Sequence, residues 1–133
     1  RALQESRVSR VGSDKDIKVD VRVLAATNKD LKKEIADGKF REDLYHRLAV
    51  ILIPVPPLND RRDDIPLLVN HFANKVAGEQ GTAVKNFTGK AVEKLQEYDW
   101  TGNIRELRNV VERLIILGGS EVSEEDVQLF ASK

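Results

Sequence analysis

Two arginines on one short charged segment are the first candidates for chemistry in this sequence. Arg41 and Arg47 lie within residues 40–48, which read FREDLYHRL. Guanidinium groups stay charged and present a fork of N–H donors that fits phosphate oxygens. On a helix, a separation of six residues places the two side chains about a third of a turn apart. The alternative is a solvated helix in which Asp43 pairs with Arg47 at i,i+4 spacing.

A third arginine follows a glycine turn. Residues 100–107 read WTGNIREL, and Gly102 predicts a turn that places Arg105 in the first turn of a helix. The helix dipole disfavours a cation there, and a residue that opposes a local rule is a candidate for function. The alternative is an arginine that water solvates at negligible cost.

Two short polar residues, Thr27 and Asn28, end the apolar run of residues 23–26. In open parallel sheets, ligands bind at the carboxyl ends of the strands. An amide at that place can position a water molecule or contact a phosphate. The alternative is that Asn28 only caps the helix that follows it.

Strands must position these residues in the first part of the chain. Alternating apolar residues over 17–23 predict a half-buried strand, and the apolar run to Ala26 predicts that its end is buried on both faces. Residues 8–11 predict a short strand paired with it across a turn at residues 12–14. Residues 50–53 predict another strand, which Pro54 stops.

Helices are expected between these strands and throughout the second part. Asn28 or Asp30 is expected to cap a helix that ends near Gly38, and a second helix covers about residues 41–48. Strands separated by helices indicate a parallel sheet. After Pro57 the sequence predicts helices only, over residues 63–77, 88–98 and 103–117, with a short one after the Ser123–Asp126 capping box.

Composition narrows the class of protein. The 133 residues are 41% hydrophobic and 33% charged with zero formal net charge, so no global field attracts nucleic acid. The absence of cysteine excludes disulfides and thiolate metal sites and fits a reducing compartment. No apolar run approaches the ~20 residues of a membrane span. His46 and His71 have no companions at metal-ligand spacing, so no metal site is expected.

Several features predict a piece of a longer protein. Methionine is absent, residues 1–5 look like the middle of a helix, and two main strands cannot form a stable sheet alone. The expected fold is an α/β fragment with an incomplete parallel sheet, over residues 1–56, followed by an all-α subdomain over residues 57–133.

Four ordered motifs resemble the later part of the AAA+ module of bacterial sigma-54-dependent transcription activators, or enhancer-binding proteins. They are similar to the sensor I strand, the arginine-finger segment, the linker into the helical lid, and the sensor II motif. In this sequence they read VRVLAATN at residues 21–28, FREDLYHRL at 40–48, PPLNDRRDDI at 56–65 and WTGNIREL at 100–107. Thr101 stands where the family usually has proline, and Asn59 where it often has arginine.

The resemblance implies a role for each candidate. Thr27 and Asn28 would sense the γ-phosphate or the attacking water. Arg41 and Arg47 would act as fingers on the nucleotide site of a neighbouring subunit, and Arg105 would contact the nucleotide of its own subunit. An arginine supplied in trans can contribute ~10³–10⁵ in the rate of phosphoryl transfer.

The resemblance also implies cofactors and partners. The intact protein would hydrolyse ATP with Mg²⁺, form a homo-oligomeric ring of six or seven subunits, and remodel sigma-54 RNA polymerase holoenzyme in the bacterial cytoplasm. It would contact DNA through a separate domain and would not contact membranes.

Two parts of an ATPase site are missing from the sequence. No segment has the Gly-x-x-x-x-Gly-Lys-Ser/Thr spacing of a P-loop, and no apolar strand ends in a Walker B Asp-Glu pair. We therefore expect no ATPase activity and no bound cofactor for this chain alone. The FTGKA stretch at residues 87–91 resembles the family's sigma-contacting loop, but its place downstream of sensor I predicts a helix cap.

Two alternatives remain open from the sequence. The chain could be a non-catalytic helical interaction module whose charges are simply solvated. It could also belong to another AAA+ branch, such as a protease or a helicase-loading ATPase.

Overall fold

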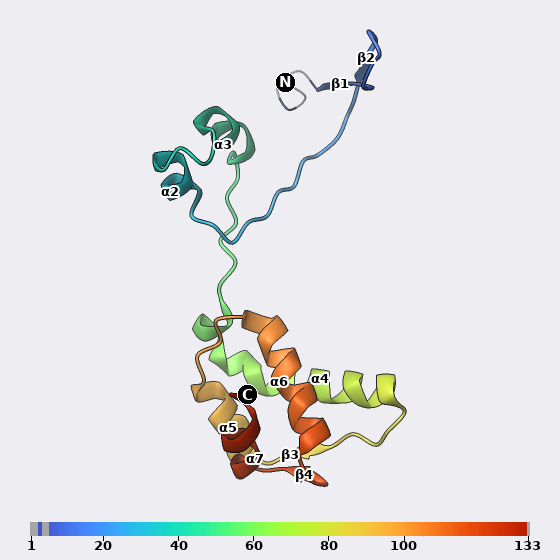
Figure 1. Cartoon of the computed structure of the whole chain (residues 1–133), viewed down its shortest axis with the longest axis vertical. Coiled ribbons are helices and arrows are strands. Elements are labelled where there is room, and N and C mark those ends of the chain that lie inside the picture. The colour runs from blue at the N-terminus through green and yellow to red at the C-terminus, as the bar shows by residue number, and fades with distance from the viewer. Residues whose placement is uncertain (1–2, 4–5, 133) are drawn as a thin grey trace. The chain divides into compact units, whose positions relative to one another are not determined.

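The chain forms two compact units, Arg1–Pro54 and Val55–Lys133. The structure is a computed structural model that describes Leu3 and residues 6–132 (Figure 1). The helix expected over residues 1–5 falls mainly outside these described residues.

A small hairpin opens the first unit, as predicted. Strand β1 (Arg7–Ser9) pairs with β2 (Asp16–Lys18) in an antiparallel register that places Val8 opposite Ile17. Gly12 lies in the turn with φ +81°, a conformation that glycine adopts without steric cost. The Val19 amide extends the pairing by donating to the Ser6 carbonyl at 2.8 Å.

The longer strands expected from the sequence are not formed, and this part of the prediction is wrong. β2 ends at Lys18, and neither residues 19–29 nor residues 50–53 belong to a strand. Leu24 is 87% exposed and Val50 80% exposed. Apolar alternation predicts a strand only if a neighbour accepts its hydrogen bonds, and no described residue supplies that neighbour.

Two short helices follow the hairpin in the described part of the first unit, both near their predicted positions. Helix α2 (Leu31–Ala36) is capped by Asp30, whose Oδ1 accepts from the amides of Lys32 and Lys33 at 3.1 and 3.3 Å. Helix α3 (Glu42–Leu48) begins directly after Arg41. In the described part of this unit no residue is buried, so the unit has no hydrophobic core of its own.

The described part of the second unit, residues 55–132, contains the core and four helices, which run close to the predicted ranges. They follow two 3₁₀ turns, η1 (Leu58–Asp60) and η2 (Arg62–Asp64). The helices are α4 (Ile65–Gln80), α5 (Gly89–Glu97), α6 (Asn103–Leu117) and α7 (Glu124–Phe130).

The predicted caps explain where these helices start and end. The Thr88 hydroxyl accepts from the Ala91 amide, and Ser123 forms a reciprocal capping box with Asp126. Helix α4 continues three residues past the predicted end at Ala77, because the left-handed C-cap is Gly81 rather than Gly78.

Two short strands, each two residues long, pair in parallel in this unit. Strand β3 (Asn86–Phe87) pairs with β4 (Glu121–Val122), so the segments before α5 and α7 lie side by side (Figure 1). The core between the helices is apolar, and Trp100, Leu107 and Leu114 are among its largest buried side chains.

The predicted fold class is confirmed, since a portion with strands and short helices precedes a mainly helical portion. The place of the parallel sheet was predicted wrongly, because β1 and β2 pair antiparallel in the first unit and the parallel pair β3–β4 lies in the second, where only helices were expected.

Candidate functional site

Arg41 stands at the start of α3, where its guanidinium is held by Asp43. Arg41 Nε donates to Asp43 Oδ1 at 3.0 Å and Nη2 donates to Oδ2 at 2.8 Å. These hydrogen bonds lower the pKa of the Asp43 carboxyl below its ordinary value, with smaller contributions from the Arg41 charge, the Leu44 amide and the Arg47 charge, while desolvation acts in the opposite direction. Because the Arg41 side chain is 80% exposed, a phosphate can replace this carboxylate without rearranging a core.

Arg47 lies on the last turn of α3 and is exposed. The alternative of an Asp43–Arg47 pair is not formed, because Asp43 is occupied by Arg41. Within residues 6–132 no ion pair or side-chain hydrogen bond involves Arg47. Its guanidinium therefore remains available to an anion.

Thr27 and Asn28 are exposed and lie in the irregular segment before α2. Thr27 Oγ1 accepts from the Lys29 amide at 3.1 Å. The alternative that Asn28 caps the helix is wrong, because Asp30 is the N-cap. The amide of Asn28 is thus not used to start α2.

Arg105 occupies the first turn of α6, as predicted, and is exposed. Its side chain has neither an ion pair nor a hydrogen bond to the part of the chain that the structure describes. The turn before it is tight. A Cβ on Gly102 would approach Glu106 Cβ to 2.7 Å, and the Glu106 carboxylate accepts from the Gly102 amide at 2.8 Å. A fixed turn therefore carries a guanidinium that no internal anion neutralises.

The turn is held by side chains that the sequence did not single out as functional. Asn103 Oδ1 accepts from the Leu58 amide at 2.9 Å, and Asn59 Oδ1 accepts from the Trp100 amide at 2.8 Å. Arg62 Nη1 donates to the carbonyls of Gln96 and Tyr98. Asn59 departs from the usual family residue, and this departure was the one signal that could have drawn attention to it.

The indole of Trp100 anchors the same turn to the core. The Trp100 side chain is 2% exposed, and its Nε1 donates to the Leu95 carbonyl at the end of α5 at 2.8 Å. The residue therefore fixes the distance between α5 and the start of α6.

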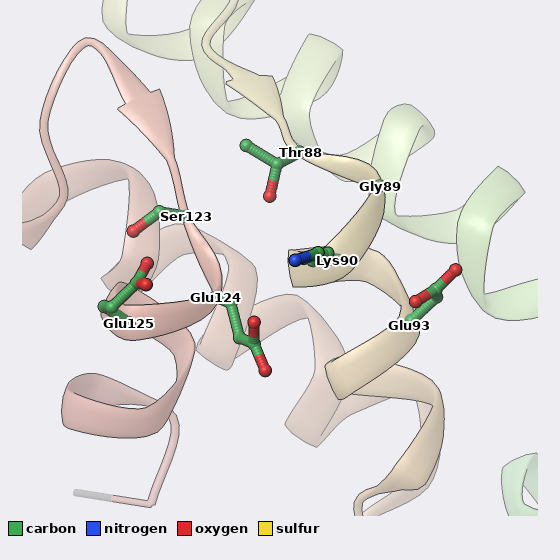
Figure 2. Close-up of a pocket in the computed structure, with 7 residues that line it drawn as sticks. All are labelled: Thr88, Gly89, Lys90, Glu93, Ser123, Glu124 and Glu125. Carbon is green, nitrogen blue, oxygen red and sulfur yellow. The ribbon is translucent and has the colours of Figure 1, made fainter.

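One hollow of the second unit lies elsewhere, between the first turns of α5 and α7 (Figure 2). It measures about 440 Å³ and is lined by Thr88, Gly89, Lys90, Glu93, Ser123, Glu124 and Glu125. Three carboxylates against one ammonium group give it a negative charge, which repels phosphate. The predicted helix cap at residues 87–91 is confirmed here, since Thr88 caps α5.

In the described ranges there is no cluster of three or more histidine, aspartate or glutamate side chains positioned to hold a metal ion. His46 lies 3.6 Å from Glu42, and His71 stacks edge-on against Phe72. Among the described residues no helix combines the length and hydrophobicity needed to span a membrane.

Comparison with known families identifies the AAA+ branch to which the chain belongs. Residues 1–54 match the sigma-54 interaction domain, and residues 59–131 match the AAA+ ATPase lid domain. The chain belongs to the AAA+ domain family of sigma-54-dependent activators. It corresponds to the C-terminal part of that domain together with its lid, and the alternative of another AAA+ branch is therefore set aside.

Individual relatives agree with this membership. The chain is 52% identical over 130 residues to the transcriptional regulatory protein ZraR of Escherichia coli strain K12, covering 97% of this chain and 30% of that protein. It is 48% identical over 125 residues to the nitrogen assimilation regulatory protein NtrX of Azorhizobium caulinodans, covering 94% and 28%.

A solved structure shares the fold. The crystal structure of NtrX from Brucella abortus in complex with ATP superposes with a TM-score of 0.85 at 42% identity, over 94% of this chain and 30% of that one. The chain thus spans about 30% of the length of the relatives it matches.

Proposed function

We propose that this chain is the sensing and trans-acting part of an ATP-hydrolysing module that remodels sigma-54 RNA polymerase in bacteria. The observation that carries the proposal is Arg105, an exposed and unpaired guanidinium on a turn that several hydrogen bonds fix. A cation held at a helix start without an internal anion suits an external phosphate.

The roles follow from the position of each side chain. Arg105 contacts the phosphates of the nucleotide bound in its own subunit. Arg41 and Arg47 reach the nucleotide of the neighbouring subunit in a homo-oligomeric ring, where Arg41 exchanges the Asp43 carboxylate for phosphate oxygens. Thr27 and Asn28 hold the attacking water or the γ-phosphate.

These residues suit phosphate but not the metal that accompanies it. The three guanidinium groups donate hydrogen bonds to anionic oxygens and repel a cation, whereas Mg²⁺ is held mainly by carboxylates, substrate phosphates and water. ATP would be cradled, and Mg²⁺ held, by residues outside this chain. What this chain contributes is positive charge and orientation in the transition state, the terms that dominate phosphoryl transfer.

Two variants of the complete module test the finger assignment. Arg41→Ala and Arg47→Ala are expected to bind ATP with unchanged affinity and to lose at least about 10³-fold in hydrolysis. Lys33→Ala, which removes an exposed cation of α2, is the control and should hydrolyse normally. Normal hydrolysis by both arginine variants would show that the assignment is wrong.

We also propose that the 133-residue chain alone neither hydrolyses ATP nor binds it tightly, because the sequence contains no phosphate-binding loop. Isothermal titration calorimetry measures this directly. A micromolar dissociation constant for ATP would contradict the proposal.

A further inference from the structure

The segment that enters the second unit is bonded to the turn that carries Arg105. Leu58 and Asn59 lie in η1, and both bond to residues about 40 positions later in the chain. Besides accepting from Trp100, Asn59 donates through Nδ2 to Asp99 Oδ1 at 2.6 Å. The entry segment and the turn are therefore joined by hydrogen bonds that involve side chains rather than by backbone–backbone hydrogen bonds.

Asn103 is the residue of this link nearest to Arg105, and its backbone is unusual. Its φ is +54°, in the left-handed region that few non-glycine residues adopt. Asparagine tolerates this region better than most residues. In this conformation the Asn103 side chain accepts from the Leu58 amide, and Leu58 is 1% exposed. A buried amide without an acceptor is costly, so Asn103 supplies an acceptor that the Leu58 amide needs.

We propose that Asn103 is a positioning residue, which couples the entry segment to Arg105 through the Leu58 amide. This inference rests on the nucleotide role proposed for Arg105. Asn103 lies two positions before Arg105 in the same first turn of α6, so a shift of η1 is passed to the guanidinium through one hydrogen bond. Asn59 acts in parallel by holding the Trp100 amide.

Three substitutions of Asn103 separate the effect of its left-handed backbone conformation from the effect of its side-chain acceptor. Asn103→Gly keeps the left-handed conformation and removes the acceptor. Asn103→Asp keeps an acceptor oxygen at the same place. Asn103→Ala loses both the acceptor and the tolerance for positive φ. Asn109→Ala, at an exposed asparagine on the same helix, is the matched control.

The first measurement is hydrogen exchange of the Leu58 amide in the 133-residue chain. Asn103→Gly is expected to accelerate exchange roughly 10-fold or more, because the amide loses its acceptor. Asn103→Asp and Asn109→Ala should leave exchange near the original rate. Unchanged exchange in Asn103→Gly overturns the proposal.

The second measurement is ATP hydrolysis by the complete module. Asn103→Gly is expected to raise KM for ATP several-fold, in the same direction as Arg105→Ala, and Asn103→Asp should restore it. A raised KM in Arg105→Ala with an unchanged KM in Asn103→Gly overturns the positioning role. An unchanged KM in Arg105→Ala overturns the nucleotide role of Arg105, and the positioning role falls with it. The exchange of the Leu58 amide still reports separately whether the hydrogen bond to Asn103 exists.

Discussion

Replacing Trp100 by alanine tests whether the turn that carries Arg105 is anchored by the core. Its side chain is almost fully buried and holds the Leu95 carbonyl through Nε1. Truncating a buried aromatic residue costs about 3–5 kcal/mol. A unit of about 80 residues has a stability of about 4–12 kcal/mol, so Trp100→Ala should remove a large part of it.

Urea unfolding followed by far-ultraviolet circular dichroism measures this loss. With an m-value of about 1 kcal/mol/M, the midpoint should fall by about 3 M or more, or the unit should be unfolded without urea. Trp100→Phe keeps an aromatic ring but leaves the Leu95 carbonyl without its donor, and should cost about 1–3 kcal/mol.

Ile116→Ala is the matched control, because Ile116 is an apolar residue of α6 that is 61% exposed. It should change stability by no more than about 0.5 kcal/mol. If Trp100→Ala destabilises the chain no more than Ile116→Ala does, Trp100 does not anchor the turn.

Two further predictions concern the first unit. Because the Asp43 pKa is lowered, the Arg41–Asp43 pair contributes its full stabilisation at pH values above the ordinary pKa of 3.8 and loses it as the pH falls through the lowered pKa. The titration of the Asp43 carboxyl, followed by NMR, should have its midpoint below 3.8, and Arg41→Ala should move that midpoint upward. Because exposed apolar residues 50–53 have no strand partner, the chain should self-associate in light scattering, and Ile51→Lys should reduce association more than Gln80→Lys, which adds the same charge on α4. If the unmodified chain and the Ile51→Lys variant are both monomers in light scattering, the second prediction is wrong.

The helices of the second unit were predictable because their signals are local. The range 103–117 matches α6, since apolar spacing and flanking glycines fix both ends. The capping box at Ser123 and Asp126 lies within four residues of sequence. Such signals do not depend on where the rest of the chain lies.

Two features were not predictable in the same way, namely whether the apolar segments form strands and which hydrogen bonds surround Arg105. Residues 50–53 have strand composition, but a strand needs a neighbour that composition does not identify. Asn59 and Trp100 are 41 positions apart, and no pattern in the sequence connects them. Sequence reasoning found Arg105 itself from its motif but missed the residues that hold its turn.

The central claim is that Arg47 acts on a neighbouring subunit while Arg105 acts within its own. A mixture of two impaired variants of the complete module, Arg47→Ala and Arg105→Ala, tests it directly when ATP is kept well below the KM of the Arg105→Ala variant. In a randomly mixed ring, a nucleotide site in an Arg47→Ala subunit keeps its own Arg105 and receives Arg47 from an Arg105→Ala neighbour. This pairing of subunits occurs at about a quarter of the sites. Equal mixing is expected to restore about a quarter of the unmodified hydrolysis rate. Hydrolysis that stays at the level of the separate variants, in rings shown to contain both, would contradict it.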